Sequence, residues 1–320
     1  MSGPLVGAIA LVVTLGATPL VMVAAGRLGI VDRPGALKPQ TDPVPYLGGV
    51  AVLAGTAFGA AAGRPTIVVP LAAAVCLGVA DDRFGLPASG RLVGQLVIGA
   101  AVVVTCPVHL PGVLAALVLP AVAVVVINGM NLIDGLDMLA AGVAAVGAGG
   151  FAVILHGSGR QLAIALGASL VGFLVYNRPP ARVYLGDGGS YLLGTALTVL
   201  LAESWAPGRA VPVGTAALVI VAIPVGEVAF AAVRRLRGRS PLMAGDRGHP
   251  YDRLVDRGWA RPLASTAYIG MEAVLAGAAL VAVHLGSMAA AVTVDALGAV
   301  LLVASAMATG ALTPDQESRA

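Results

Sequence analysis

Long apolar runs separated by short polar segments extend along almost the whole chain. The runs are continuous, whereas the strands of an outer-membrane barrel would alternate between apolar and polar positions, so we expect membrane-spanning helices. The fold class predicted is all-α, with residues 1–320 forming one polytopic membrane domain of about eleven spans. Their expected bounds are 4–26, 48–63, 66–80, 91–106, 112–127, 139–155, 161–176, 190–203, 212–233, 264–285 and 288–308.

Composition supports this interpretation and excludes a soluble protein. The 320 residues are 58% hydrophobic and 11% charged, with a mean hydropathy of +0.94. Ordinary soluble domains carry about 25% charged residues. The sequence pI of about 9.1 does not indicate a nucleic-acid partner, because the basic residues fall in loops rather than on one soluble face.

The distribution of charge predicts the orientation in the membrane. The loops 27–47, 81–90, 128–138, 177–189 and 234–263 fall on one side together with the tail 309–320. With Arg91 at a span edge, that side carries 16 of the 19 Lys and Arg residues, so it is expected to be cytoplasmic. The N-terminus is then outside and the C-terminus inside. Twelve of the 16 acidic residues share that side, which places the expected chemistry at the cytoplasmic face.

The segment from Asn128 to Asp137 joins two of these spans and is the most informative polar stretch. Polar side chains recur every three residues, at Asn128, Asn131, Asp134 and Asp137. Residues three apart share a face of a helix or helical turn, so all four are expected to converge on one object. Carboxylates beside amides suit a hard cation and a hydroxyl-rich ligand. The alternative is a plain polar loop between two spans.

Two further acidic motifs stand at span edges. Asp81 and Asp82 place two like charges at the C-terminal end of a predicted helix, where both mutual repulsion and the helix dipole oppose them. A cation or a proton-transfer role explains that arrangement better than solubility, although a solvated turn before Pro87 is the alternative. Arg91, which opens the next span, is a candidate phosphate partner or a topology anchor.

Asp187 lies among glycines at the start of another span, and Ser190 is predicted to cap that helix. Glycines would let backbone N–H groups approach a phosphate, and Asp187 could hold a divalent ion that bridges it. A glycine-rich start to a tightly packed helix would produce the same pattern, so that alternative stays open.

The remaining polar candidates are spread over a loop, a span and the longest polar segment. Lys38 could serve a phosphate or act only in topology. Glu227 sits inside a span where Pro224 and Gly226 predict a bend or break. The arginine-rich loop 234–263 contains His249 and Asp252, which suggest a recognition lobe for an anionic ligand. An anchor for anionic lipid is the alternative.

Taken together, the sequence resembles the polyprenyl-phosphate N-acetylhexosamine-1-phosphate transferase superfamily from Gly29 to about Trp259. Five motifs in order carry the resemblance: Asp-Arg-Pro with Lys38 and Leu-Gly-Gly49, Asp81-Asp82 with Arg91-Leu-Val-Gly-Gln95, the Asn128–Asp137 segment, Gly186-Asp187-x-Gly-Ser190, and His249. The resemblance implies a membrane enzyme that moves a sugar-1-phosphate from a UDP-sugar to a polyprenyl phosphate and releases UMP. It further implies a bacterial-type plasma membrane, the first step of lipid-linked cell-envelope glycan synthesis, and Mg²⁺ as cofactor, with Mn²⁺ as an alternative. A homodimer is left open.

The same resemblance implies roles for individual residues. Asp187 would ligate the metal. The expected catalytic carboxylates are Asp81, Asp82, Asp134 and Asp137, and the expected substrate-binding residues are Lys38, Arg91, Asn128, Asn131, Glu227, His249 and Asp252.

Several positions depart from the family pattern. Gln40 replaces a histidine after Lys38, Met138 replaces a frequent glycine, and the basic residue of the second motif is Arg91 instead of lysine. The usual histidine cluster is reduced to His249, which argues against a MurNAc-pentapeptide substrate and favours the GlcNAc-1-phosphate transferase branch. Two rival hypotheses are a secondary transporter, suggested by Glu227 beside Pro224, and a catalytically impaired scaffold, suggested by the lost histidines.

Overall fold

The computed structural model describes residues 1–33, 42–106, 108, 110–241 and 248–313, and within them the chain is all-α as predicted. The α-helices are α1 (Gly3–Leu28), α2 (Gly48–Gly63), α3 (Val68–Phe84), α4 (Ala88–Thr105), α5 (Gly112–Leu132), α6 (Leu139–Ile154), α7 (Gly157–Asn177), α8 (Gly186–Ser204), α9 (Val211–Ala217), α10 (Ala222–Gly238), α11 (Pro250–Asp256), α12 (Arg261–Leu285) and α13 (Met288–Thr309). Two 3₁₀ turns, η1 (Pro65–Ile67) and η2 (Leu218–Val221), and two short antiparallel strands, β1 (Val31–Asp32) and β2 (Val44–Pro45), complete the described elements.

Seven helical stretches in the described chain are long and apolar enough to cross a membrane: α1, α4, α5, α7, the run 211–238, α12 and α13. The helices α2 and α6 are apolar but shorter. This confirms a multi-pass membrane protein. Helices occupy every predicted range, but the number of eleven crossings stays a prediction.

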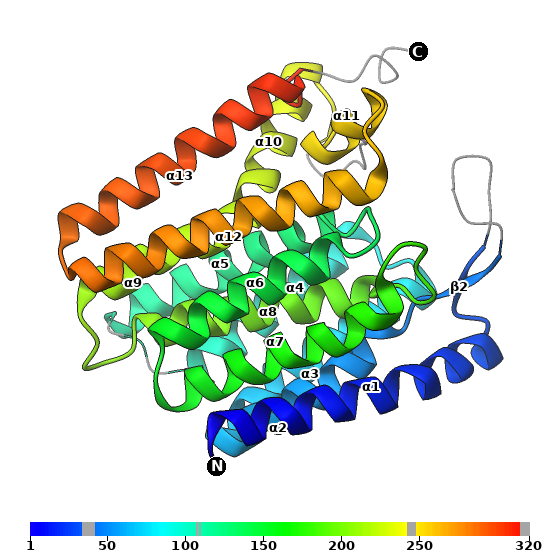
Figure 1. Ribbon diagram of the computed structural model, residues 1–320, viewed down its shortest axis with the longest axis horizontal. Helices are drawn as coiled ribbons and strands as arrows, with labels where there is room; N and C mark the ends of the chain where they lie inside the picture. The colour runs from blue at the N-terminus through cyan, green and yellow to red at the C-terminus, as the bar shows by residue number, and fades with distance from the viewer. Residues whose placement is uncertain (34–41, 107, 109, 242–247, 314–320) are drawn as a thin grey trace.

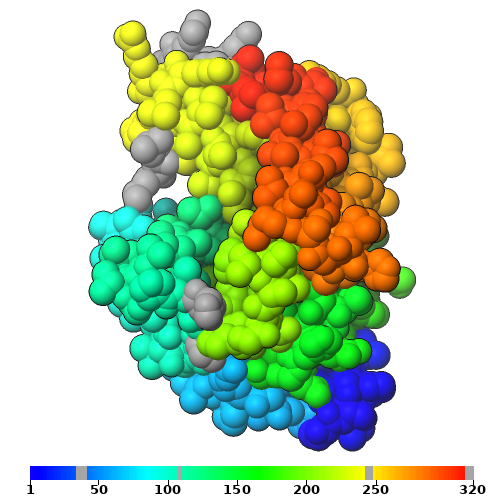
Figure 2. Space-filling view, turned by 90° about the vertical axis from the view of Figure 1, so that its left-hand side faces the viewer, coloured from blue at the N-terminus to red at the C-terminus, as the bar shows by residue number. Residues whose placement is uncertain are grey.

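The long helices run side by side, and the start of α1 and the end of α13 lie at opposite ends of the bundle (Figure 1). Seen from the left-hand end of that view, the N-terminal α1 and the C-terminal α13 are separated by the green middle of the chain (Figure 2). At the other end of the bundle, β1 and β2 lie near the start of α2. There, the N–H groups of Gly48 and Gly49 donate to the carbonyls of Tyr184 and Leu185, each at 3.0 Å.

Helix α8 is the core of the bundle, because all its residues from Gly188 to Ser204 are buried. Small residues allow its neighbours to approach closely, as is usual for helices packed in membranes. A Cβ added at Gly194 would lie 2.4 Å from the Cα of Ile127 on α5. The N-terminus of this central helix carries Asp187, so packing in the bundle positions a predicted metal ligand.

The predicted break near Glu227 exists, but it lies earlier in the chain than the residues that suggested it. The α-helix is interrupted at η2, which separates α9 from α10. Pro224 lies in the first turn of α10, where a proline costs no helical hydrogen bond, and Gly226 lies within the continuous helix. Proline therefore follows the interruption instead of producing it at its own position.

Candidate active site

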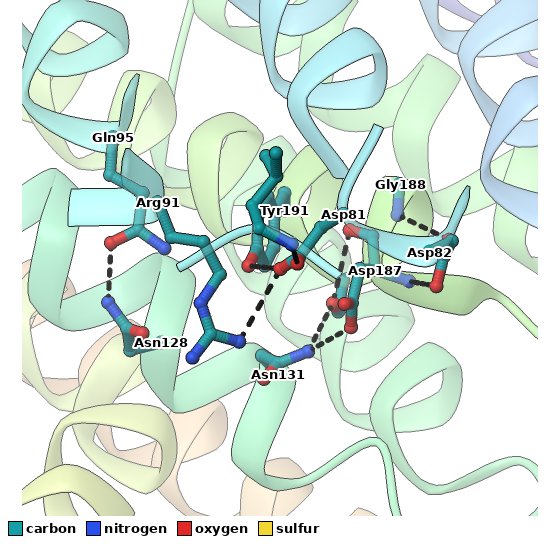
Figure 3. Close-up of polar contacts among 11 residues, drawn as sticks. Asp81, Asp82, Arg91, Gln95, Asn128, Asn131, Asp187, Gly188 and Tyr191 are labelled. Carbon is teal, nitrogen blue, oxygen red and sulfur yellow. Dashed lines mark hydrogen bonds and ion pairs between the residues drawn. The ribbon is translucent and has the colours of Figure 1, made fainter. Parts of the chain in front are cut away.

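Asp81 lies in the last turns of α3, buried, and three donors hold its carboxylate (Figure 3). The N–H of Leu86 donates to Oδ1 at 2.9 Å, while the Tyr191 hydroxyl donates to Oδ2 at 2.8 Å. Arg91 Nη1 lies 3.4 Å from the same Oδ2 and pairs with its charge. The alternative of a solvated turn does not hold for Asp81, since its side chain is buried and is fixed from α4 and α8.

Asp82 has different partners from its neighbour. Its Oδ1 accepts the N–H of Asp187 at 3.1 Å, and its Oδ2 accepts the N–H of Gly188 at 3.4 Å. The carboxylate of α3 thus caps the N-terminus of α8. The prediction that Ser190 caps this helix is wrong, because α8 begins at Gly186 and the Ser190 hydroxyl donates to the Asp187 carbonyl inside the helix at 3.3 Å.

The glycines around Asp187 serve close packing. A Cβ added at Gly49 would lie 2.3 Å from the Gly189 nitrogen, and one at Gly78 would lie 2.3 Å from the Asp187 carbonyl oxygen. The N–H groups that were expected to meet a phosphate are bonded to Asp82 instead. The structure therefore supports the alternative of a tightly packed helix start.

The Asn128–Asp137 segment divides its contacts among several neighbours. Asn131 Nδ2 donates to Asp187 Oδ1 at 2.7 Å and to Ser190 Oγ at 3.1 Å. Asn128 Nδ2 donates to Gln95 on α4 at 2.6 Å, and Asp137 Oδ2 accepts the N–H of Ala181 at 3.0 Å. Helix α5 ends at Leu132, so the spacing of three does not continue as one helical face. Asn128 and Asp137 thus have other protein partners, whereas Asn131 donates to Asp187 and Asp134 lies close enough to Asp187 for their charges to repel. Convergence of all four on one ligand stays a prediction.

Four acids form what we call the acidic cluster: Asp81, Asp82, Asp134 and Asp187. Burial and then the Asp187 charge raise the pKa of Asp82 to about 7. Burial and then the Asp81 charge raise the pKa of Asp187 to about 6. For Asp134, burial followed by repulsion from Asp187 and Asp82 raises the pKa well above its ordinary value. Arg91 pairs with Asp81, and the repulsion among the other three acids indicates an excess of negative charge that would suit a cation.

The donor set of this cluster fits Mg²⁺. Within the described ranges, no three His, Cys, Asp or Glu side chains form a complete metal cage. A complete cage is not required, because Mg²⁺ is usually held by one or two carboxylates, with water and substrate phosphates as its other ligands. Asp187 offers such a carboxylate, and Asn131 fixes its orientation.

A second buried polar group joins α10, α11 and α12. His249 Nδ1 lies 2.9 Å from Glu227 Oε2, and the Tyr268 hydroxyl donates to Glu227 Oε1 at 2.8 Å. Because a carboxylate can only accept, Nδ1 carries the hydrogen. The His249 ring stacks on Tyr251 with centroids 5.4 Å apart, and the Tyr251 hydroxyl donates to the Leu132 carbonyl at 2.6 Å. We call Glu227, His249 and Tyr268 the histidine network; Tyr251 links it to the end of α5.

The other predicted site residues have simpler outcomes. Lys38 lies outside the described residues, and so does Gln40. Asp252 lies in the first turn of α11.

Two tyrosines of the site, Tyr191 and Tyr268, were not predicted from the sequence. Tyr191 could have been found, because it follows Asp187 by four residues and therefore shares its helical face. Tyr268 gave no such signal, since its partner Glu227 is 41 residues away.

Comparison with known proteins places these residues in a family. The model of glycosyl transferase family 4 matches residues 65–204, which include the acidic cluster. A protein of Bacillus subtilis (strain 168), named probable undecaprenyl-phosphate N-acetylglucosaminyl 1-phosphate transferase, is 30% identical over 270 residues, covering 77% of this chain and 75% of the relative. The chain belongs to glycosyl transferase family 4.

Two further relatives are similar to this chain over most of their length. The decaprenyl-phosphate N-acetylglucosaminephosphotransferase of Mycolicibacterium smegmatis (strain ATCC 700084 / mc(2)155) is 31% identical over 308 residues, 79% of this chain and 75% of its own. The undecaprenyl-phosphate alpha-N-acetylglucosaminyl 1-phosphate transferase of Yersinia pestis is 31% identical over 264 residues, which cover 73% of this chain and 71% of the relative. The predicted superfamily and branch are confirmed. The family 4 match ends at residue 204, before the histidine network.

Proposed function

We propose that this chain transfers N-acetylglucosamine-1-phosphate from a UDP-sugar to a polyprenyl phosphate, releases UMP, and so initiates a lipid-linked cell-envelope glycan. The observation that carries the proposal is the acidic cluster, gathered from α3, α8 and the turn after α5 within the segment that matches family 4. Relatives whose names include the N-acetylglucosaminyl 1-phosphate transferase activity align with 77% and 73% of this chain.

Asp187 would hold Mg²⁺, or Mn²⁺ in its place. When bound, the ion supplies positive charge to the diphosphate of the donor and to the departing UMP. Asn131 keeps the Asp187 carboxylate in one orientation through its 2.7 Å hydrogen bond. Asp81 is fixed by Tyr191 and Arg91, so it is placed to orient the lipid phosphate or to accept its proton.

The UDP-sugar would bind to the turn after α5 and to the histidine network. Asp134 and Asp137 follow α5 directly, and the Tyr251 hydroxyl contacts the Leu132 carbonyl at the start of that turn. His249 would contact the diphosphate or the sugar, with its ring orientation set by Glu227. Asn128, Lys38 and Asp252 remain proposed substrate-binding residues.

An apolar groove supports a lipid acceptor. It encloses about 600 Å³ between α5, η2, α10 and α13, and almost all of its lining is aliphatic or aromatic, with Asp295 as the charged exception among its lining residues. A polyprenyl chain is a hydrocarbon and would be buried there favourably. The positive-inside charge pattern orients the acidic cluster toward the cytoplasm, with the N-terminus outside and the C-terminus inside. A homodimer stays a prediction.

Purified protein with polyprenyl phosphate and a panel of UDP-sugars tests the proposal directly. We expect UMP release and a lipid-linked product with a UDP-N-acetylhexosamine, and loss of both when EDTA removes divalent ions. A transporter would bind or move the nucleotide-sugar without releasing UMP, and an impaired scaffold would give neither product. The Asp187→Asn protein, purified identically, controls for contaminating enzymes.

A further inference from the structure

The first turn of α8 is capped by a residue from another helix. An α-helix begins with N–H groups that lack partners inside the helix, and a capping side chain usually satisfies one or two of them. The N-cap position of α8 is Leu185, whose aliphatic side chain cannot accept a hydrogen bond. Asp82 supplies both oxygens instead, at 3.1 Å from the Asp187 nitrogen and 3.4 Å from the Gly188 nitrogen.

The surroundings leave this carboxylate little freedom. Gly186 has φ +71°, and a Cβ added there would lie 2.2 Å from the Tyr46 carbonyl oxygen and 2.7 Å from Asp82 Oδ2. On the other side, a Cβ at Gly78 would lie 2.3 Å from the Asp187 carbonyl oxygen. Helices α3 and α8 therefore meet at van der Waals distance just where Asp82 binds. A longer acid at position 82 would collide with this backbone or leave the cap.

Asp82 and Asp81 are adjacent, yet their partners differ in kind. The hydrogen bonds of Asp81 come from the Leu86 backbone and from two side chains, those of Tyr191 and Arg91. Those of Asp82 come from the backbone of the helix that carries Asp187. We propose that Asp82 is a positioning residue: it caps α8 and thereby sets the place of the Asp187 carboxylate, instead of exchanging a proton or reacting with a substrate.

Two variants of Asp82 distinguish the role of its hydrogen-bonding geometry from the role of its negative charge. Asp82→Asn removes the negative charge but keeps an oxygen where Oδ1 accepts from Asp187, and asparagine is among the best capping residues. Asp82→Glu keeps the charge but adds a methylene between α3 and the cap. If Asp82 positions Asp187, the Asn variant should keep more amide protection and more turnover than the Glu variant. If the charge of Asp82 acts on the reaction or on the metal, the Glu variant should keep more turnover.

The structural arm of the test needs no substrate or metal. Hydrogen–deuterium exchange is measured on the peptide that contains Asp187 and Gly188, in detergent-purified wild type, Asp82→Asn and Asp82→Glu. Loss of a cap is expected to speed exchange of these amides roughly two- to thirtyfold in Asp82→Glu. Asp82→Asn keeps the acceptor for the Asp187 N–H and replaces the acceptor for Gly188 by an NH₂ group, so its exchange should speed up less than that of Asp82→Glu. An exchange rate in Asp82→Glu equal to that of wild type would overturn the cap.

The activity arm rests on the proposed function. With the best UDP-sugar, kcat should fall by roughly a hundredfold in Asp82→Glu, as expected for a misplaced ligand, and by less in Asp82→Asn. The reverse order, with slow exchange retained in Asp82→Asn, would show that charge and not position matters. If wild type itself forms no product, the proposed function fails, and the exchange data still decide whether Asp82 caps α8. Asp82→Ala, which lacks both oxygen and charge, should lose protection and turnover together.

Discussion

The acidic cluster and the histidine network both bury carboxylates near the same turn, but they are completed in different ways. In the histidine network, Glu227 has a partner on each oxygen, one from His249 and one from Tyr268. In the acidic cluster, repulsion among neighbouring acids adds to burial and raises the pKa values of Asp82, Asp134 and Asp187. Arg91 forms an ion pair with Asp81 in this cluster, and its charge also lowers the pKa of Asp187 without offsetting the repulsion there.

This difference separates a carboxylate whose two oxygens are both paired from a cluster of acids whose mutual repulsion a cation would relieve. A buried acid with two hydrogen-bond partners satisfies both donors, and removing the acid leaves those donors without an acceptor. Buried acids that repel one another destabilise the fold until a positive charge arrives. Neutralising Asp187 and neutralising Glu227 should therefore have opposite effects on stability, and that contrast can be measured.

The largest effect is expected from Asp187→Asn. Asparagine keeps an oxygen for Asn131 but loses the charge that would hold the metal, so turnover should fall by about a thousandfold or more. The melting temperature in EDTA should stay equal to wild type or rise, because one repelling charge is gone. Lipid-linked product and thermal unfolding in detergent measure the two effects. Near-normal turnover would remove Asp187 as the metal ligand.

Glu227→Gln should act in the opposite direction on stability. The amide can accept from Tyr268, but its NH₂ group would face His249 Nδ1, so that ring either loses this partner or must move its hydrogen to Nε2. Leaving a buried donor unsatisfied costs about 1–3 kcal/mol, which lowers the melting temperature by a few degrees.

Turnover should fall with the loss of the fixed His249 ring. Tyr268→Phe is the matched control, because it removes one donor and leaves Glu227 with His249. A melting temperature for Glu227→Gln at or above that of wild type would contradict the contrast between the regions.

A smaller effect is expected from pH in the metal-free protein. Asp82 has a pKa of about 7 and Asp187 of about 6 in the fold, against an ordinary value of 3.8. Because folding raises these values, the stability that they contribute is present below pH 3.8 and lost as pH rises through 6 to 7.

Thermal unfolding in EDTA should therefore show a melting temperature that declines between pH 5 and pH 7.5, with acidic and histidine groups elsewhere adding their own background. Saturating Mg²⁺ should flatten this decline, and Asp187→Asn should reduce both the decline and the response to Mg²⁺. An equal pH dependence with and without Mg²⁺ would argue against a metal in the cluster.

The sequence predicts the fold where burial produces a periodic or continuous pattern of apolar residues along the chain. Continuous apolar runs gave the helices, and unusual acids at their ends gave Asp81, Asp82 and Asp187. Contacts between distant segments were not readable. Ser190 was the best local cap for α8, and nothing near it in the chain shows that Asp82, 105 residues before Asp187, does that work. Similarly, the spacing of three from Asn128 to Asp137 gave no sign that α5 ends at Leu132.

The smallest predicted effect lies at Met138, in the N-cap position of α6 directly after Asp137. This residue has φ 60°, a left-handed conformation that costs a residue with a side chain roughly 1 kcal/mol and costs glycine almost nothing. Its N–H donates to Asn177 Oδ1 at 2.9 Å, a backbone contact that any substitution except proline keeps.

Met138→Gly should therefore stabilise the protein by up to about 1 kcal/mol, since relief of strain exceeds the added freedom of the unfolded chain. Met138→Ala is the control, because it shortens the side chain and keeps the Cβ that is strained. Thermal unfolding should rank glycine above methionine and alanine. The reverse ranking would mean that packing of the methionine side chain stabilises the turn after Asp137 by more than the left-handed backbone conformation costs.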